Sequence, residues 1–149
     1  MNTSKELASL FSRDLARLRK QIESFSSDDP LWQTLPGVTN SAGNLALHLE
    51  GNLREFVGRL LGGLPYDRKR DLEFSSKGFS RDELGLRIAE LSQTIPSVIE
   101  RLSAEELENE YPQVVLDVAS STQEFLFHLY GHLNWHLGQI DYLRRMLNG

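Results

Sequence analysis

The chain has 149 residues, the length of a single domain that can bury a large apolar core without help from a metal or a disulfide. Its net charge of −5 argues against a nucleic-acid-binding protein, which normally presents a basic face. The absence of cysteine excludes disulfides, iron–sulfur clusters and a cysteine nucleophile. Because no apolar run approaches the ~20 residues that span a membrane and the first residues lack a signal-peptide core, we expect a cytoplasmic protein without a membrane segment.

Two helices are predicted in the first part of the chain. The first covers residues 4–25, where apolar side chains recur every three or four positions: Leu7, Phe11, Leu15, Leu18, Ile22 and Phe25. Serine, aspartate, proline and glycine are frequent in residues 24–40 and predict a loop. The second helix is expected to begin with Asn40 or Ser41 as its cap and to end at Gly62-Gly63.

A third helix is predicted after a polar connection over residues 65–79. Three basic residues at 68–70 lie between two aspartates in this connection, and we interpret them as part of a solvated loop. Ser80 and Glu83 form a capping-box signature that begins the third helix. Pro96 lies inside this helix and is predicted to kink or split it, because proline removes an internal hydrogen bond.

The segment before the last helix has the weakest pattern. Residues 105–110 are acidic, and residues 113–118 are interpreted as a short strand or an ordered loop. The last helix is expected to begin at Ser121 or Thr122 and to run to about Leu147. Together these elements predict an all-α fold: an antiparallel four-helix bundle with long connecting loops, formed by the whole chain as one domain.

The four histidines form the most distinctive pattern in the sequence. His128, His132 and His136 are spaced four residues apart in the last helix, and His48 lies on the inner face of the second helix. A helix brings residues four apart onto one face, so two imidazoles of the last helix can bind one ion. A third imidazole from a neighbouring helix completes a three-nitrogen set with an open coordination position, which is typical of reactive metal sites.

Each candidate residue also has a structural interpretation. His136 takes the place of an apolar residue in the helix seam, where a buried imidazole needs hydrogen-bond partners. His128 lies further around the helix, because successive steps of four drift by ~40°, and we place it at the surface or behind the ligands. Gln139 and Asn52 share faces with His136 and His48, and each can orient a ligand, hold a water or serve as an amide at the edge of the core. The glutamates of di-iron bundles and of the zinc-protease motif are missing from the pattern.

These histidine motifs resemble those of a known family. The sequence His132-Leu-Asn-Trp-His136-Leu-Gly-Gln139-Ile140 resembles the H-x-x-x-H-x-G-Q-I signature of the DinB-like superfamily. Residues 40–52 are similar to the part of the family pattern that contains the second-helix histidine, which is His48 here. Residues 62–74 resemble a branch of the superfamily that has no characterised activity.

The resemblance implies an up-down-down-up four-helix bundle in which His48, His132 and His136 hold a divalent ion: zinc, nickel or iron. His128 is not part of the shared pattern. The resemblance also implies a homodimer and thiol-dependent chemistry, because the characterised relatives are bacillithiol transferases and a mycothiol-dependent maleylpyruvate isomerase. The family name refers to DNA-damage induction and implies no contact with DNA.

We therefore expect a metal-dependent transferase that uses a low-molecular-weight thiol and an electrophilic small molecule. Because the chain has no cysteine, the thiol must come from outside, take the open metal position and lose its proton there. A metal-dependent hydrolase uses the same ligands, and Gln139, Asn52 or His128 are candidates for proton handling. The alternative is a non-catalytic, dimeric bundle that binds a metal or a small ligand. A histidine phosphotransfer module is disfavoured, because His48 lacks the nearby lysine of such modules.

Overall fold

The computed structural model describes residues 2–148 and has the all-α fold that the sequence predicts. The first helix, α1 (Thr3–Glu23), is capped by Asn2, whose side chain accepts a hydrogen bond of 3.2 Å from the backbone N–H of Lys5. The loop after α1 contains the short 3₁₀-helix η1 (Asp29–Trp32). The predicted apolar face of α1 is buried in the core of the bundle: Leu7, Phe11, Leu15, Leu18 and Ile22.

The second helix, α2 (Ala42–Leu53), begins after Ser41, one of the two caps that the sequence predicts. The Oγ atom of Ser41 accepts a hydrogen bond of 3.2 Å from the backbone N–H of Asn44. The helix continues into η2 (Arg54–Arg59), a turn of the wider π-helix. The chain turns away at Gly63, whose φ of +65° is a left-handed conformation that favours glycine.

The third long helix, α4 (Arg81–Glu100), begins with the capping box predicted for Ser80 and Glu83. The alternative of a split at Pro96 is wrong, because α4 is a single helix through this residue. Proline removes one internal hydrogen bond, but Ile95 and Ile99 remain fully buried around it. Their packing against the core keeps the segment helical despite the missing bond.

The chain between α4 and the last helix is mostly irregular. It begins with the short helix α5 (Ala104–Glu108), which has a capping box of its own. The alternative of a strand at residues 113–118 is wrong: this segment forms a tight turn in which Leu116 and Asp117 have φ values of 60°. The last helix, α6 (Thr122–Leu147), has the predicted limits.

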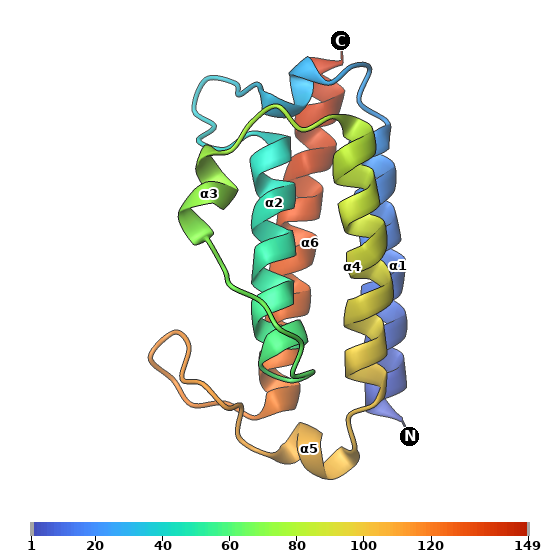
Figure 1. The fold of residues 1–149 in the computed structure, drawn as a ribbon, viewed down its shortest axis with the longest axis vertical. Helices are drawn as coiled ribbons and strands as arrows, with labels where there is room; N and C mark the ends of the chain where they lie inside the picture. The colour runs from blue at the N-terminus through green and yellow to red at the C-terminus, as the bar shows by residue number, and fades with distance from the viewer. Residues whose placement is uncertain (1, 149) are drawn as a thin grey trace.

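The four long helices form an up-down-down-up bundle. Figure 1 shows α1 and α6 rising while α2 and α4 descend, and this is the topology that the resemblance implied. The helix α1 packs along α4, and α2 lies beside α6 in the antiparallel direction. In the part of the chain that the structure describes, no helix has the length and apolar character needed to cross a membrane.

The connection between α2 and α4 differs from the prediction. It contains a further short helix, α3 (Arg70–Ser75), which packs against α2 (Figure 1). The interpretation of the basic run as a solvated loop holds for Lys69, but it is wrong for Arg68, whose side chain is 13% exposed and pairs with Glu73. Because α3, α4 and α6 surround α2, all residues from 42 to 53 are buried.

Candidate metal centre

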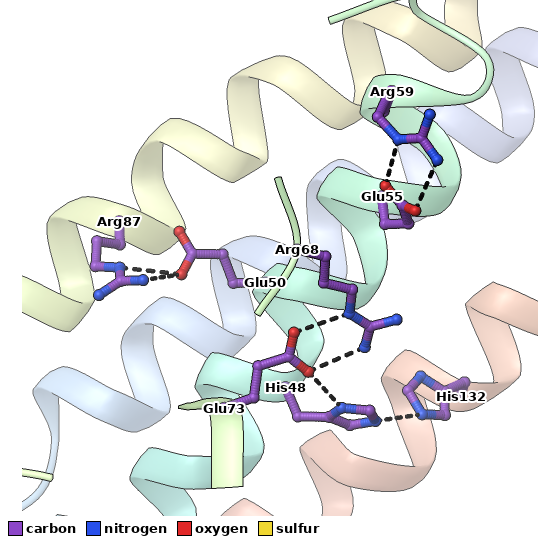
Figure 2. Close-up of polar contacts among 8 residues, drawn as sticks. All are labelled: His48, Glu50, Glu55, Arg59, Arg68, Glu73, Arg87 and His132. Atoms are coloured by element: carbon purple, nitrogen blue, oxygen red, sulfur yellow. Dashed lines mark hydrogen bonds and ion pairs between the residues drawn. The ribbon is translucent and has the colours of Figure 1, made fainter. Parts of the chain in front are cut away.

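Three of the four histidines meet between α2 and α6. His48 lies on α2, whereas His132 and His136 lie one turn apart on α6. Each histidine offers one ring nitrogen to the cluster, and these three nitrogens all lie within 4.8 Å of one another. The Nε2 atoms of His48 and His132 are 3.2 Å apart (Figure 2). The antiparallel packing of α2 and α6 therefore produces a cluster that could hold a metal ion.

The chemistry of the cluster fits a divalent ion. Two nitrogen ligands of a tetrahedral ion lie about 3.3 Å from each other, given metal–nitrogen bonds of ~2.0–2.1 Å, and the observed separation of 3.2 Å between His48 and His132 agrees with this value. The Nδ1 atom of His132 is buried without a hydrogen-bond partner among residues 2–148, so contacts within this part of the chain satisfy only one nitrogen of the ring. Three imidazoles also leave room in the coordination shell for a small molecule.

Both histidines of α6 in the cluster favour the neutral form. Burial lowers the pKa of His132 from 6.5 to about 4, and repulsion from the neighbouring rings of His136 and His48 adds to this effect. Burial also lowers the pKa of His136, although its hydrogen bond to Gln139 acts in the opposite direction. Neutral imidazole is the metal-binding form, so these ligands need not release a proton before they bind an ion near neutral pH.

The pKa of His132 predicts that the metal-free protein loses stability in mild acid. Between the unfolded pKa of 6.5 and the folded pKa of about 4, the unfolded chain binds more protons than the folded one. The contribution of His132 to the free energy of unfolding is therefore fully present above pH 6.5, and it is lost as the pH falls from 6.5 to about 4. We expect the unfolding free energy to fall by roughly 1–2 kcal/mol from about pH 7 to about pH 5, with allowance for the partial exposure of the ring.

Urea denaturation of the chelator-treated protein at several pH values measures this loss. The variant His132→Asn serves as the control, because asparagine does not titrate, and its stability should depend less steeply on pH. Equal pH slopes for the wild type and the variant are the result that would contradict the assignment.

A carboxylate that the sequence analysis missed orients His48. Its Nδ1 atom lies 3.0 Å from Oε1 of Glu73, a residue of α3 that is 6% exposed. Arg68 donates two further hydrogen bonds of 2.9 Å to the same carboxylate (Figure 2). Burial raises the pKa of Glu73, but the hydrogen bonds from His48 and Arg68 outweigh burial and the net shift is downward. An ionised carboxylate accepts hydrogen bonds, so the neutral ring of His48 carries its hydrogen on Nδ1 and turns the lone pair of Nε2 toward the cluster.

The remaining predicted residues have different positions. Gln139 takes the orienting role, since its Oε1 atom accepts a hydrogen bond of 2.7 Å from Nδ1 of His136. Asn52 is buried, and its Oδ1 atom has no partner in the described part of the chain. His128 is exposed and lies outside the cluster, where its ring stacks on Phe125 with 5.5 Å between the ring centroids.

A pocket of about 720 Å³ opens beside the cluster. His136 and Gln139 form part of its wall. Most of the other lining residues are apolar or aromatic: Leu35, Val38, Leu45, Trp135, Tyr142, Leu143 and Met146. A small molecule with an apolar body can therefore lie directly against one of the candidate metal ligands.

Comparisons with known proteins agree with this fold. A DinB-like protein from Bacillus cereus ATCC 10987 has a similar structure, with a TM-score of 0.68 and 17% sequence identity over 89% of this chain and 85% of that chain. At this identity the likeness shows a shared fold. No curated protein matches the sequence. Residues 3–149 match the family described as "Protein of unknown function (DUF1572)", and the chain therefore belongs to the DUF1572 family and has a DinB-like fold.

Proposed function

We propose that this protein is a divalent-metal enzyme that transfers a low-molecular-weight thiol to a small electrophile with an apolar body. The position of His136 carries the proposal, because this residue belongs both to the histidine cluster and to the wall of the apolar pocket. His48, His132 and His136 would hold the ion, and zinc, nickel and iron all accept imidazole ligands. When bound, the ion supplies the Lewis acidity that favours the thiolate form of the thiol.

The residues of the chain have separate tasks in this proposal. Glu73 and Gln139 hold His48 and His136 with a ring nitrogen directed at the cluster. The apolar wall of the pocket binds the electrophile and places it beside His136. The transfer forms a sulfur–carbon bond, breaks the bond between that carbon and its leaving group, and releases the thiol proton to solvent. The nucleophile comes from outside, because the chain has no cysteine.

The test is thiol-dependent turnover by protein purified without an affinity tag and loaded in turn with zinc, nickel or iron(II). We expect at least one of cysteine, glutathione, coenzyme A and bacillithiol to react with monobromobimane faster than it does without the protein. The folded variant His48→Ala should lose this acceleration. Metal binding without triad-dependent turnover would favour the non-catalytic bundle, and thiol-independent cleavage of an apolar ester would favour a hydrolase.

Trp135 provides a separate test of the pocket. This side chain lines the pocket and is 70% exposed, so its truncation removes contact area for the electrophile and leaves the core intact. In Trp135→Ala we expect the KM for the electrophile to rise about tenfold, the equivalent of ~1.4 kcal/mol of lost apolar contact, with unchanged metal content. Phe127→Ala is the matched control, because Phe127 is an exposed aromatic residue of α6 outside the residues that line the pocket. Equal KM values for the two variants would place the electrophile elsewhere.

A further inference from the structure

We propose that Glu73 is a positioning residue of the metal centre: its carboxylate, held by Arg68 and accommodated by Gly51, fixes the orientation and tautomer of His48 and thereby sets the metal affinity. The inference rests on the proposed metal centre, and it assigns a role to the connection between α2 and α4.

One face of α2 contacts α3 and the carboxylate of Glu73. Asn44, His48 and Gly51 are spaced by four and three residues, so they lie on the same side of the helix. The side-chain amide of Asn44 donates hydrogen bonds to the backbone carbonyls of Glu73 and Ser76, at 3.0 and 2.8 Å. The backbone position of Glu73 is thus secured independently of its carboxylate.

Gly51 provides the space that the carboxylate occupies. A Cβ atom at this position would collide with Oε2 of Glu73 and lie only 2.5 Å from its Cδ. Glycine is unfavourable inside a helix, because it loses more conformational freedom on folding than any other residue. Here its presence has a structural reason: a side chain at residue 51 would force the carboxylate of Glu73 to leave the position in which it contacts His48 and Arg68.

The ring of His48 is held from several directions. Its Nδ1 atom pairs with Glu73, and the ring lies 4.8 Å from that of Phe74 between centroids. Arg68 completes the arrangement, because its two hydrogen bonds orient the carboxylate that faces the ring (Figure 2). Without Glu73, the neutral ring can carry its hydrogen on Nε2, the atom that faces His132, and a protonated Nε2 cannot bind an ion.

The experiment compares zinc affinity in the full-length protein by competition with a chelator. Glu73→Ala and Gly51→Ala are expected to weaken zinc binding by about 10–100-fold, the usual effect of losing a partner behind a ligand histidine. Gly58→Ala is the matched control on the continuation of the same helix, because a Cβ there meets nothing nearer than 4.0 Å. Glu73→Gln retains an acceptor oxygen and loses the charge, so we expect it to recover part of the affinity.

Nitrogen NMR of the metal-free protein provides a readout that does not depend on activity. We expect the hydrogen of His48 on Nδ1 in the wild type and in Gly58→Ala, and a substantial population with the hydrogen on Nε2 in Glu73→Ala and Gly51→Ala. Gly51→Ala retains every polar group. If Glu73→Ala does not fold, the tautomer of His48 and the zinc affinity in Gly51→Ala still test the proposal.

The outcomes separate this inference from the proposed function. Unchanged zinc affinity and an unchanged His48 tautomer in folded Glu73→Ala and Gly51→Ala would overturn the positioning role and leave the metal centre intact. A wild-type protein that binds no divalent ion would overturn the metal centre. In that case the tautomer of His48 still decides whether Glu73 orients the ring.

Discussion

Replacement of His132 by alanine is expected to weaken zinc binding by at least ~100-fold, because it removes one of the three proposed protein ligands. The Nε2 atom of His132 on α6 is 3.2 Å from that of His48 on α2, so its loss opens the cluster at the contact between the two helices. The substitution leaves Leu133 and Leu129 in place on the buried face of α6, so the bundle should still fold. Bound zinc per chain after dialysis, together with chelator competition, measures the effect.

His128→Ala is the matched control for this prediction. It removes the same type of side chain one turn earlier on the same helix, from an exposed position outside the cluster. We expect its zinc affinity to equal that of the wild type. Equal losses of affinity in His128→Ala and His132→Ala would show that the ion is not held by the proposed set of histidines.

Replacement of Asp14 by alanine is expected to lower the free energy of unfolding by about 1–3 kcal/mol, because the groups that donate hydrogen bonds to its buried carboxylate lose their acceptor. Asp14 lies on α1 and is fully buried. Its carboxylate accepts hydrogen bonds from the guanidinium of Arg13, the hydroxyl of Tyr130 and the amide of Asn134. The last two residues flank His132 in α6, so this network joins α1 to the segment that contains a candidate ligand.

Urea denaturation of Asp14→Ala measures this effect. Asp67→Ala is the control, because Asp67 also pairs with a basic residue, Lys69, but its side chain is 83% exposed. An exposed ion pair contributes roughly 0–1 kcal/mol, so the control should unfold close to the wild type. Similar losses of stability in the two variants would show that the hydrogen bonds of Asp14 do not anchor α1 to α6.

The fold was largely predictable because its signals are local. The serine caps at Ser41 and Ser121 and the capping box at Ser80 act within one helical turn, and the structure confirms all three. The periodic apolar residues of α1 are likewise visible in the sequence and buried in the bundle. The direction of each helix was available only from the family resemblance. Helical periodicity does not indicate at which end of the bundle a long connecting loop starts the next helix.

The candidate site was predictable only in part. The spacing of His132 and His136 places them one turn apart on any helix, and the inner face of α2 could be inferred for His48. Arg68 and Glu73 lie in a short segment with no apolar period, where their acidic and basic neighbours resemble those of a solvated loop. Their pairing with each other and with His48 depends on how α3 packs against α2, and no local sequence pattern predicts that packing.

The homodimer, the cytoplasmic location and the thiol remain predictions that follow from the resemblance and from composition. The sequence by itself determined where the four long helices begin, which faces they bury and which histidines lie one turn apart, because each of these depends on neighbours within a few residues. Only the tertiary structure decided that Glu73 lies behind His48, that Gly51 makes room for it and that His136 borders an apolar pocket. These contacts join separate helices, and their formation depends on the packing of the whole bundle.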